Sequence, residues 1–267
     1  MNERVKDLRK KLIKKAKKQV QEKYEGKEGH IIRGISVVQD LDASFNLLAE
    51  HCIEWYGMHF PELQRLVKDN RAFLKLVYFI GDKSKFSEKT IGDNTELKNA
   101  KTIVEKAKKS MGSSIDDSSL KELQLLALNA LNLREERDFL MKFIDIEMSA
   151  IAANFSKIAG SMLAAKLLAE AGSLRRLAMA PSSTIQMLGA EKALFRHLKN
   201  RAAKPPKHGF ILMHPFVQKV PRKNKGKMAR ALAGKLSIAV KEDYFGKKDI
   251  SKELQTSLEN RFEQLKS

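Results

Sequence analysis

One uninterrupted helical stretch, residues 119–156, limits the folds open to this chain. It contains no proline and no glycine, so nothing in it forces a turn. An α-helix of that length would be about 57 Å long at 1.5 Å per residue, which is longer than a compact core accommodates. We therefore expect it to pair with other helices as a coiled coil.

The residues that precede this stretch also have helical periodicity. Further helices are predicted over 2–25, 31–57, 61–77 and 95–111, with a polar loop over 81–94. Ser119 and Glu122 have the spacing of a capping box, which we expect to start the long helix. Residues 1–156 are predicted to form a long antiparallel coiled-coil region that dimerises. The apolar candidates for self-association are Ile103, Leu126, Leu133 and Leu140.

The style of the sequence changes after Gly160, and we expect a compact helical domain over 157–267. Gly172 is a predicted helix C-cap and Ser173 the N-cap of the next helix. Residues 210–214 are predicted to be a short strand or a buried extended segment. Two further helices are expected over 227–241 and 251–266. The predicted fold class is all-α.

Positive charge is concentrated in one part of this second domain. Between Gly189 and Lys235 there are thirteen lysines and arginines but a single acid, Glu191, so this segment carries +12 of the formal +19 of the chain. The pI is near 9.9. Such a surface favours an anionic partner, nucleic acid first and an anionic membrane second. No apolar run approaches the roughly 20 residues of a membrane-spanning helix, so we expect no membrane partner.

The motifs of several enzyme classes are absent from the sequence. There is no GxxxxGK[ST] loop, no GxGxxG after a strand and no HExxH. The six histidines have no metal-ligand spacing, and Cys52 is the only cysteine. The basic segment has one acid where acid–base catalysis would need paired carboxylates. We therefore expect a binding protein without cofactor or metal, and not an enzyme.

Several motifs occur in the order found in the Nop domain. They are Ala171-Gly-Ser-Leu174, Pro181-Ser-Ser-Thr-Ile-Gln186, Gly189-Ala-Glu-Lys-Ala-Leu-Phe-Arg-His-Leu198, Pro205-Pro-Lys-His-Gly209 and Gly226-Lys-Met-Ala-Arg230. Upstream, Trp55-Tyr-Gly-Met-His-Phe-Pro-Glu-Leu63 resembles a segment of the coiled-coil region of the same proteins. Nearly the whole chain therefore resembles the Nop-domain core protein of archaeal box C/D ribonucleoproteins.

The resemblance implies a non-catalytic scaffold for guide-directed RNA 2′-O-methylation, in which fibrillarin transfers the methyl group. The implied partners are a box C/D guide RNA with a kink-turn, the small ribosomal-like protein that binds the kink-turn, and a second copy of the chain. Family members have a further N-terminal domain that docks fibrillarin, whereas this chain opens on the basic segment 2–25. Direct binding of fibrillarin is therefore the weakest of the implied partnerships.

Individual residues are assigned by position in the motifs. The implied RNA contacts are Lys192, Arg196, Lys199, Lys207, His208, Arg222, Lys225, Lys227 and Arg230. Lysine and arginine suit phosphates, and a histidine on a loop suits stacking on a base. The implied contacts with the kink-turn protein are Gly189, Ala190, Glu191 and Ala193. Phe195 and Leu198 are predicted to be core, and Trp55 and Tyr56 to pack at the base of the coiled coil.

Two other functions compete with this one. A spliceosomal protein with a Nop domain would also bind a kink-turn ribonucleoprotein. A coiled-coil adaptor without specific RNA recognition would spread its charge along the helices instead of concentrating it. The absence of a long Lys/Glu-rich C-terminal tail favours an archaeal, cytoplasmic protein over a nucleolar one.

Overall fold

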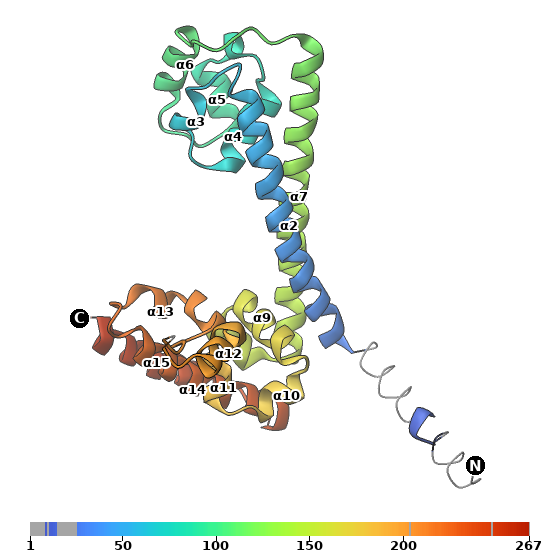
Figure 1. Ribbon diagram of the computed structural model, residues 1–267, viewed down its shortest axis with the longest axis vertical. Coiled ribbons are helices and arrows are strands. Elements are labelled where there is room, and N and C mark those ends of the chain that lie inside the picture. The colour runs from blue at the N-terminus through green and yellow to red at the C-terminus, as the bar shows by residue number, and fades with distance from the viewer. Residues whose placement is uncertain (1–8, 10, 15–25, 203, 247, 267) are drawn as a thin grey trace. The chain divides into compact units, whose positions relative to one another are not determined.

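The computed structural model describes residues 9, 11–14, 26–202, 204–246 and 248–266, and these residues form helices and loops without any β-strand (Figure 1). The predicted all-α class is confirmed. The predicted helix over 2–25 lies outside the described residues, apart from residues 9 and 11–14. No described helix combines the length and apolar character needed to cross a membrane.

The chain divides into two compact units. The middle unit comprises residues 37–140, and the terminal unit comprises the described residues of 1–36 together with 141–267. Helices α2 (Lys27–Tyr56) and α7 (Asp117–Ile151) contribute residues to both. These units are defined by packing, whereas the predicted boundary at 156/157 separates self-association from RNA binding and stays a prediction.

The middle unit packs short helices against parts of α2 and α7. These helices are α3 (Leu63–Leu66), α4 (Asn70–Phe79), the 3-10 turn η1 (Lys83–Lys85), α5 (Glu88–Asn94) and α6 (Ala100–Lys108). Tyr56, Phe60 and Phe73 are almost completely buried in its core, and pairs of aromatic rings meet there edge to face. Tyr56 therefore packs as predicted, while Trp55 is 38% exposed.

Three local predictions for this unit are wrong, and side-chain caps explain each difference. The helix expected over 61–77 is divided into α3 and α4, because the Asp69 carboxylate accepts the Ala72 N–H and starts a new helix. Residues 81–94 are not a loop, since Ser87 and Thr90 form a capping box that starts α5. The long helix starts at Asp117 because Asp116, and not Ser119, is the cap: its carboxylate accepts the Ser119 N–H at 2.9 Å.

The terminal unit is built around α14 (Lys225–Lys241). Eight residues of this helix are buried, and it contacts α8, α10, α11, α13 and α15. The elements of this unit in chain order are α8 (Ala153–Ala159), α9 (Ser161–Ala171), α10 (Leu174–Met179), α11 (Ser182–Met187), α12 (Glu191–Lys199), η2 (Phe210–Met213), α13 (Pro215–Lys219), α14, the π-turn η3 (Glu242–Gly246) and α15 (Ser251–Lys266). Burial of the apolar face of α14 thus holds the unit together.

Several predictions for the terminal unit are confirmed, and two are wrong. Gly172 ends α9 with a φ of 79°, and the Ser173 hydroxyl caps α10. The long helix ends at Ile151 and not near 156, because Ala152 leaves helical geometry and the Asp243 carboxylate accepts the N–H groups of Asn154 and Phe155 at the start of α8. Residues 210–213 form a 3-10 turn, not a strand.

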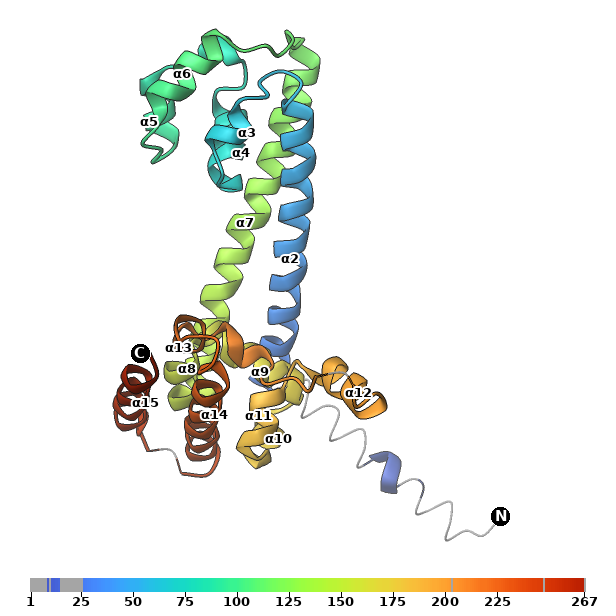
Figure 2. The same ribbon diagram turned by 60° about the vertical axis from the view of Figure 1, so that its left-hand side comes forward.

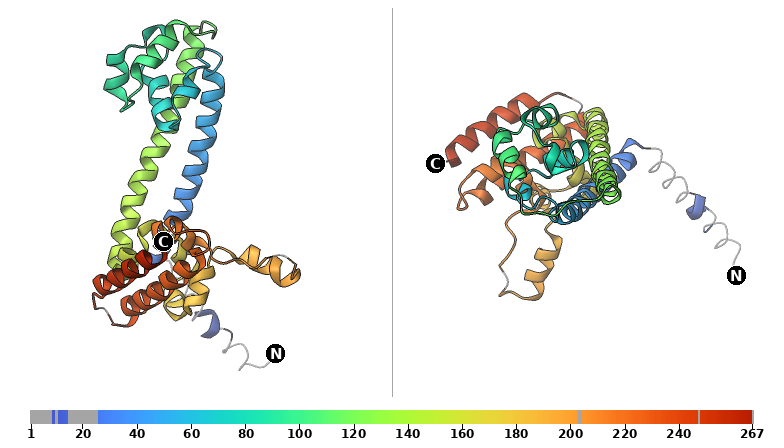
Figure 3. Two further views of the ribbon diagram at one scale, coloured as in Figure 1. Left: turned by 90° about the vertical axis from the view of Figure 1, so that its left-hand side faces the viewer. Right: turned by 90° about the horizontal axis from the view of Figure 1, so that it is seen from above.

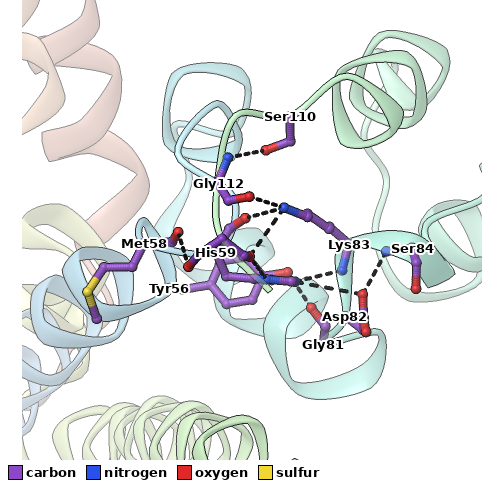
Figure 4. Close-up of polar contacts among 10 residues, drawn as sticks. Tyr56, Met58, His59, Gly81, Asp82, Lys83, Ser84, Ser110 and Gly112 are labelled. Atoms are coloured by element: carbon purple, nitrogen blue, oxygen red, sulfur yellow. Dashed lines mark hydrogen bonds and ion pairs between the residues drawn. The ribbon is translucent and has the colours of Figure 1, made fainter. Parts of the chain in front are cut away.

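A buried histidine joins three loops of the middle unit (Figure 4). The Lys83 N–H donates to His59 Nε2 at 2.9 Å, so the proton of the neutral ring is on Nδ1, which donates to the Ser113 carbonyl at 2.8 Å. The Lys83 ammonium donates to the carbonyls of His59, Gly112 and Ser113. His59 is only 3% exposed, so neither of its partners has water as an alternative.

We expect His59→Phe to lower the free energy of unfolding by about 2–4 kcal/mol, because it leaves a buried N–H and a buried carbonyl without partners. Urea denaturation measures the change. His51→Phe is the control, since His51 is exposed on α2 and its replacement should change stability by less than about 0.5 kcal/mol. Equal stability of the two variants would contradict the role given to His59.

His214 makes the stability of the terminal unit depend on pH. Its Nε2–H donates to the Ile158 carbonyl and its Nδ1 accepts the Phe216 N–H at the start of α13, which requires the neutral ring. Burial lowers the pKa of His214 below its ordinary value of 6.5, and the hydrogen bond to Ile158 opposes this only partly. Below pH 6.5 the unfolded chain therefore binds more protons than the folded chain, and stability falls with pH.

We expect the free energy of unfolding to decrease as pH falls below 6.5, and to decrease less steeply in His214→Asn. Asparagine retains an N-cap acceptor but does not titrate. Denaturation at several pH values between 7.5 and 5 gives both slopes. His208, whose pKa is also lowered, contributes equally to both proteins and cancels in the comparison. Identical slopes would rule out His214 as the titrating group.

Candidate nucleic-acid interface

The helix of the basic motif, α12, stands on a narrow neck. The Gly209 N–H donates to the Gln186 carbonyl and the Phe210 N–H to the Leu188 carbonyl, both at 2.8 Å. The Gln186 side-chain amide adds a bond to the Lys207 carbonyl at 2.7 Å. These bonds join the two ends of the segment 189–208, so the chain leaves the bundle and returns to it at the same place.

Two glycines of the motifs make this neck possible. Gly189 has a φ of 83°, and a Cβ there would lie 2.6 Å from the Phe210 ring. A Cβ at Gly209 would lie 1.9 Å from the Leu188 carbonyl oxygen. The Glu191 carboxylate accepts the Gly189 N–H at 2.8 Å and so fixes the entry into α12. Glu191 therefore has a local structural role beside the partner contact predicted for it.

The helix α12 is separated from the other helices of the terminal unit (Figures 2 and 3). None of its residues is buried. Phe195 and Leu198 are 61% and 65% exposed, so the prediction that they are core is wrong. The neck explains the difference, because it holds the helix away from the apolar face of α14. Sequence periodicity alone did not distinguish the two placements, although the polar residues on both sides of α12 offered nothing to cover it.

The structure divides the predicted RNA contacts into two groups. Lys192, Arg196 and Lys199 are exposed on α12. Lys207, Lys227 and Arg230 line an open hollow of about 530 Å³ together with Ser183, Gln186 and Lys223. The remaining two cations, Arg222 and Lys225, lie at the start of α14 and are not part of this lining. We call this second group the α14 hollow.

The eight cations in these groups have no carboxylate partners. Within the described part of the chain none of them forms an ion pair, although Lys27, Arg134 and Lys157 elsewhere do so at 3.0, 3.1 and 2.8 Å. Their charge is therefore uncompensated and oriented toward solvent. Such cations suit the phosphates of a nucleic acid, which release counterions when they are neutralised.

His208 lies between the two groups and is half-buried. Burial lowers the pKa of its ring, and the charges of Lys225 and Lys207 lower it further. The neutral imidazole has an unhydrated aromatic face, which is the property that a stacking contact with a base requires.

The other predicted site residues occupy different environments. Gly189 and Ala193 are exposed and Ala190 is half-buried, all at the base of α12. Ile103 is completely buried in the core of the middle unit, so it stabilises that core and offers no surface for self-association. The remaining candidates on α7, which are Leu126, Leu133 and Leu140, are half-buried. No group of three or more metal-ligating side chains occurs among the described residues.

A helical unit with this much uncompensated positive charge has the surface chemistry of a nucleic-acid-binding protein. The family model Nop, described as "snoRNA binding domain, fibrillarin", matches residues 37–264. The chain therefore belongs to the Nop family.

Known relatives agree with this assignment. A NOP5 family protein of Methanocaldococcus jannaschii is 40% identical over 260 residues, which are 97% of this chain and 61% of that protein. Nucleolar protein 56 of Saccharomyces cerevisiae is 38% identical over 82% of this chain and 44% of its own length. The chain thus spans about half of these relatives. A solved fibrillarin/Nop5p complex contains a chain of similar fold, with a TM-score of 0.50 and 26% identity over 98% of this chain and 78% of that one.

We expect Gly209→Ala to destabilise the neck by roughly 1–3 kcal/mol, because the new methyl group overlaps the Leu188 carbonyl. Trypsin should then cleave α12 faster than in the wild type. Gly234→Ala is the matched control, since nothing lies within 4 Å of a Cβ at that position of α14 and the substitution should leave cleavage unchanged. Equal cleavage rates in all three proteins would contradict the role of the neck.

Proposed function

We propose that this chain is the RNA- and protein-binding part of a non-catalytic box C/D scaffold. The observation that carries the proposal is the projecting α12, which presents uncompensated cations beside exposed Phe195 and Leu198. Family membership supports the RNA, and the exposed apolar side chains support a protein surface next to it.

The two kinds of side chain on α12 have different proposed partners. Lys192, Arg196 and Lys199 contact phosphates of a kink-turn RNA, and the α14 hollow contacts the same RNA through Lys207, Lys227 and Arg230. The base of α12, from Gly189 to Ala193, contacts the small kink-turn-binding protein, and we add Phe195 and Leu198 to this surface. A chain of this kind recognises the RNA and the protein together, because neither alone covers the helix.

Other parts of the proposal concern the whole assembly. Self-association through the helical region of 1–156 and binding to fibrillarin, which carries out the methyl transfer, follow from the family relationship. The nucleolus is the proposed location in a eukaryotic cell, as the names of the yeast and bovine relatives suggest, and the cytoplasm in an archaeal cell. A spliceosomal protein of the same family is the alternative that would use the same surfaces.

The proposal predicts that Lys192→Ala with Arg196→Ala weakens binding to a preformed complex of kink-turn RNA and its protein by roughly 1–3 kcal/mol. A gel-shift titration measures the change. Arg175→Ala with Arg176→Ala is the control: it removes the same charge from α10, away from α12 and from the lining of the α14 hollow. We expect the control to bind nearly as the wild type does.

Two outcomes would contradict the proposal. Equal weakening in both double variants would mean that net charge alone drives binding, which is the behaviour of an adaptor with a generally basic surface. Equal affinity of the wild type for bare RNA of any sequence and for the RNA–protein complex would remove the composite surface.

A further inference from the structure

A second open hollow of about 810 Å³ lies between α14 and α15, apart from the predicted site. Its lining includes three cations, Lys235, Lys252 and Arg261, and the polar side chains of Thr256, Asn260 and Gln264. We call it the α14–α15 groove. Figure 2 shows the two helices side by side, in agreement with their contacts.

The groove and the α14 hollow flank the same exposed face of α14. Lys227, Arg230 and Gly234 follow one another at helical spacings of three and four on this face, opposite the buried apolar residues. Arg230 lines the α14 hollow, and the next residue, Ala231, lines the groove. A ligand that lies across this face therefore contacts both.

The direction of α15 brings the cations of the two hollows together. Asn224 at the start of α14 donates its side-chain N–H to the Leu265 carbonyl near the end of α15 at 2.9 Å, so the two helices run antiparallel. Arg261, in the last turns of α15, consequently lies at the end of the groove that is nearer to Lys227 and Arg230.

The charge of the groove is also uncompensated. Among the described residues Lys235 and Lys252 form no ion pair, and Arg261 donates only to Gln264 within its own helix. Glu253, in the first turn of α15, is the one acid of the lining, while Glu259 and Glu263 are not part of it. Three cations against one acid favour a polyanion over an acidic or basic peptide patch of mixed charge.

We propose that the α14–α15 groove is a second phosphate-binding track for the RNA bound at α12 and the α14 hollow, an inference that rests on the proposed function. The cations neutralise phosphates, and the hydroxyl and amide groups donate to phosphate and sugar oxygens. The lining contains no aromatic side chain for stacking on a base, so the contact is independent of RNA sequence.

The dimensions give the length of RNA involved. From Lys227 to Lys235 the axis of α14 rises about 12 Å at 1.5 Å per residue. This corresponds to roughly three to four nucleotides of one strand in a duplex, at about 3.4 Å each. An RNA whose stem ends at the α14 hollow is thus too short to occupy the groove, and a stem extended by several base pairs is long enough.

The test uses a triple variant, Lys235→Gln, Lys252→Gln and Arg261→Gln. Its control, Arg175→Gln, Arg176→Gln and Lys219→Gln, removes the same charge from exposed positions outside both linings. Each protein is titrated, with the kink-turn-binding protein present, against kink-turn RNAs with a short stem and with stems lengthened by four and eight base pairs. The titrations are repeated from 50 to 200 mM salt, and circular-dichroism melting checks that every variant is folded.

For the long stems we expect the slope of log affinity against log salt to be shallower by about 2 to 2.7 in the groove variant, at 0.7–0.9 per phosphate contact. Raising the salt fourfold then weakens this variant by roughly 16- to 40-fold less than the wild type. The short stem and the control variant should show no such difference.

The outcomes separate the inference from the proposed function. Wild-type affinity and slope of the groove variant on long stems would overturn the inference, whether or not the groove holds an acidic peptide. An equal loss on short and long stems would also overturn it, since the short RNA ends before the groove. If the Lys192→Ala and Arg196→Ala variant binds normally as well, the proposed function fails too.

Discussion

The burial of one face of α14 is the interaction on which the terminal unit depends. Alanine and leucine side chains on that face allow α8, α10, α11, α13 and α15 to pack closely around a single helix. Because a helix has two faces, the same element presents lysine and arginine to solvent on the opposite side. Core formation and the display of charge are therefore fixed together, and every candidate contact on α14 is held by a rigid scaffold.

The neck of α12 solves a different physical problem. A nine-residue helix is too short to be stable in water by itself, and this one has no buried face to stabilise it. Backbone hydrogen bonds at Gly209 and Phe210, and the carboxylate of Glu191 at its start, replace the missing packing. The helix can therefore leave its apolar side chains uncovered without losing its position, which is what a surface for another molecule requires.

Sequence reasoning predicted the features that depend on periodicity and on local caps. The all-α class, the buried face of α15 and the caps at Gly172 and Ser173 follow from the pattern of residues. It failed where one side chain interrupts a periodic run, as Asp69 does between α3 and α4. It also placed Phe195 in the core, because an amphipathic pattern is the same whether its apolar side meets a core or a partner. The hollows needed residues distant in sequence and were invisible to it.

The uncompensated cations of α12 and α14 have a consequence for the free chain. Like charges held close together repel one another, so the unbound terminal unit is under electrostatic strain that a polyanion relieves. Any anion that binds the folded form preferentially is then also a stabiliser of the fold. Salt acts on the two properties in opposite directions: ions that screen the repulsion strengthen the isolated protein, while the same ions compete for the phosphates that the assembly would use.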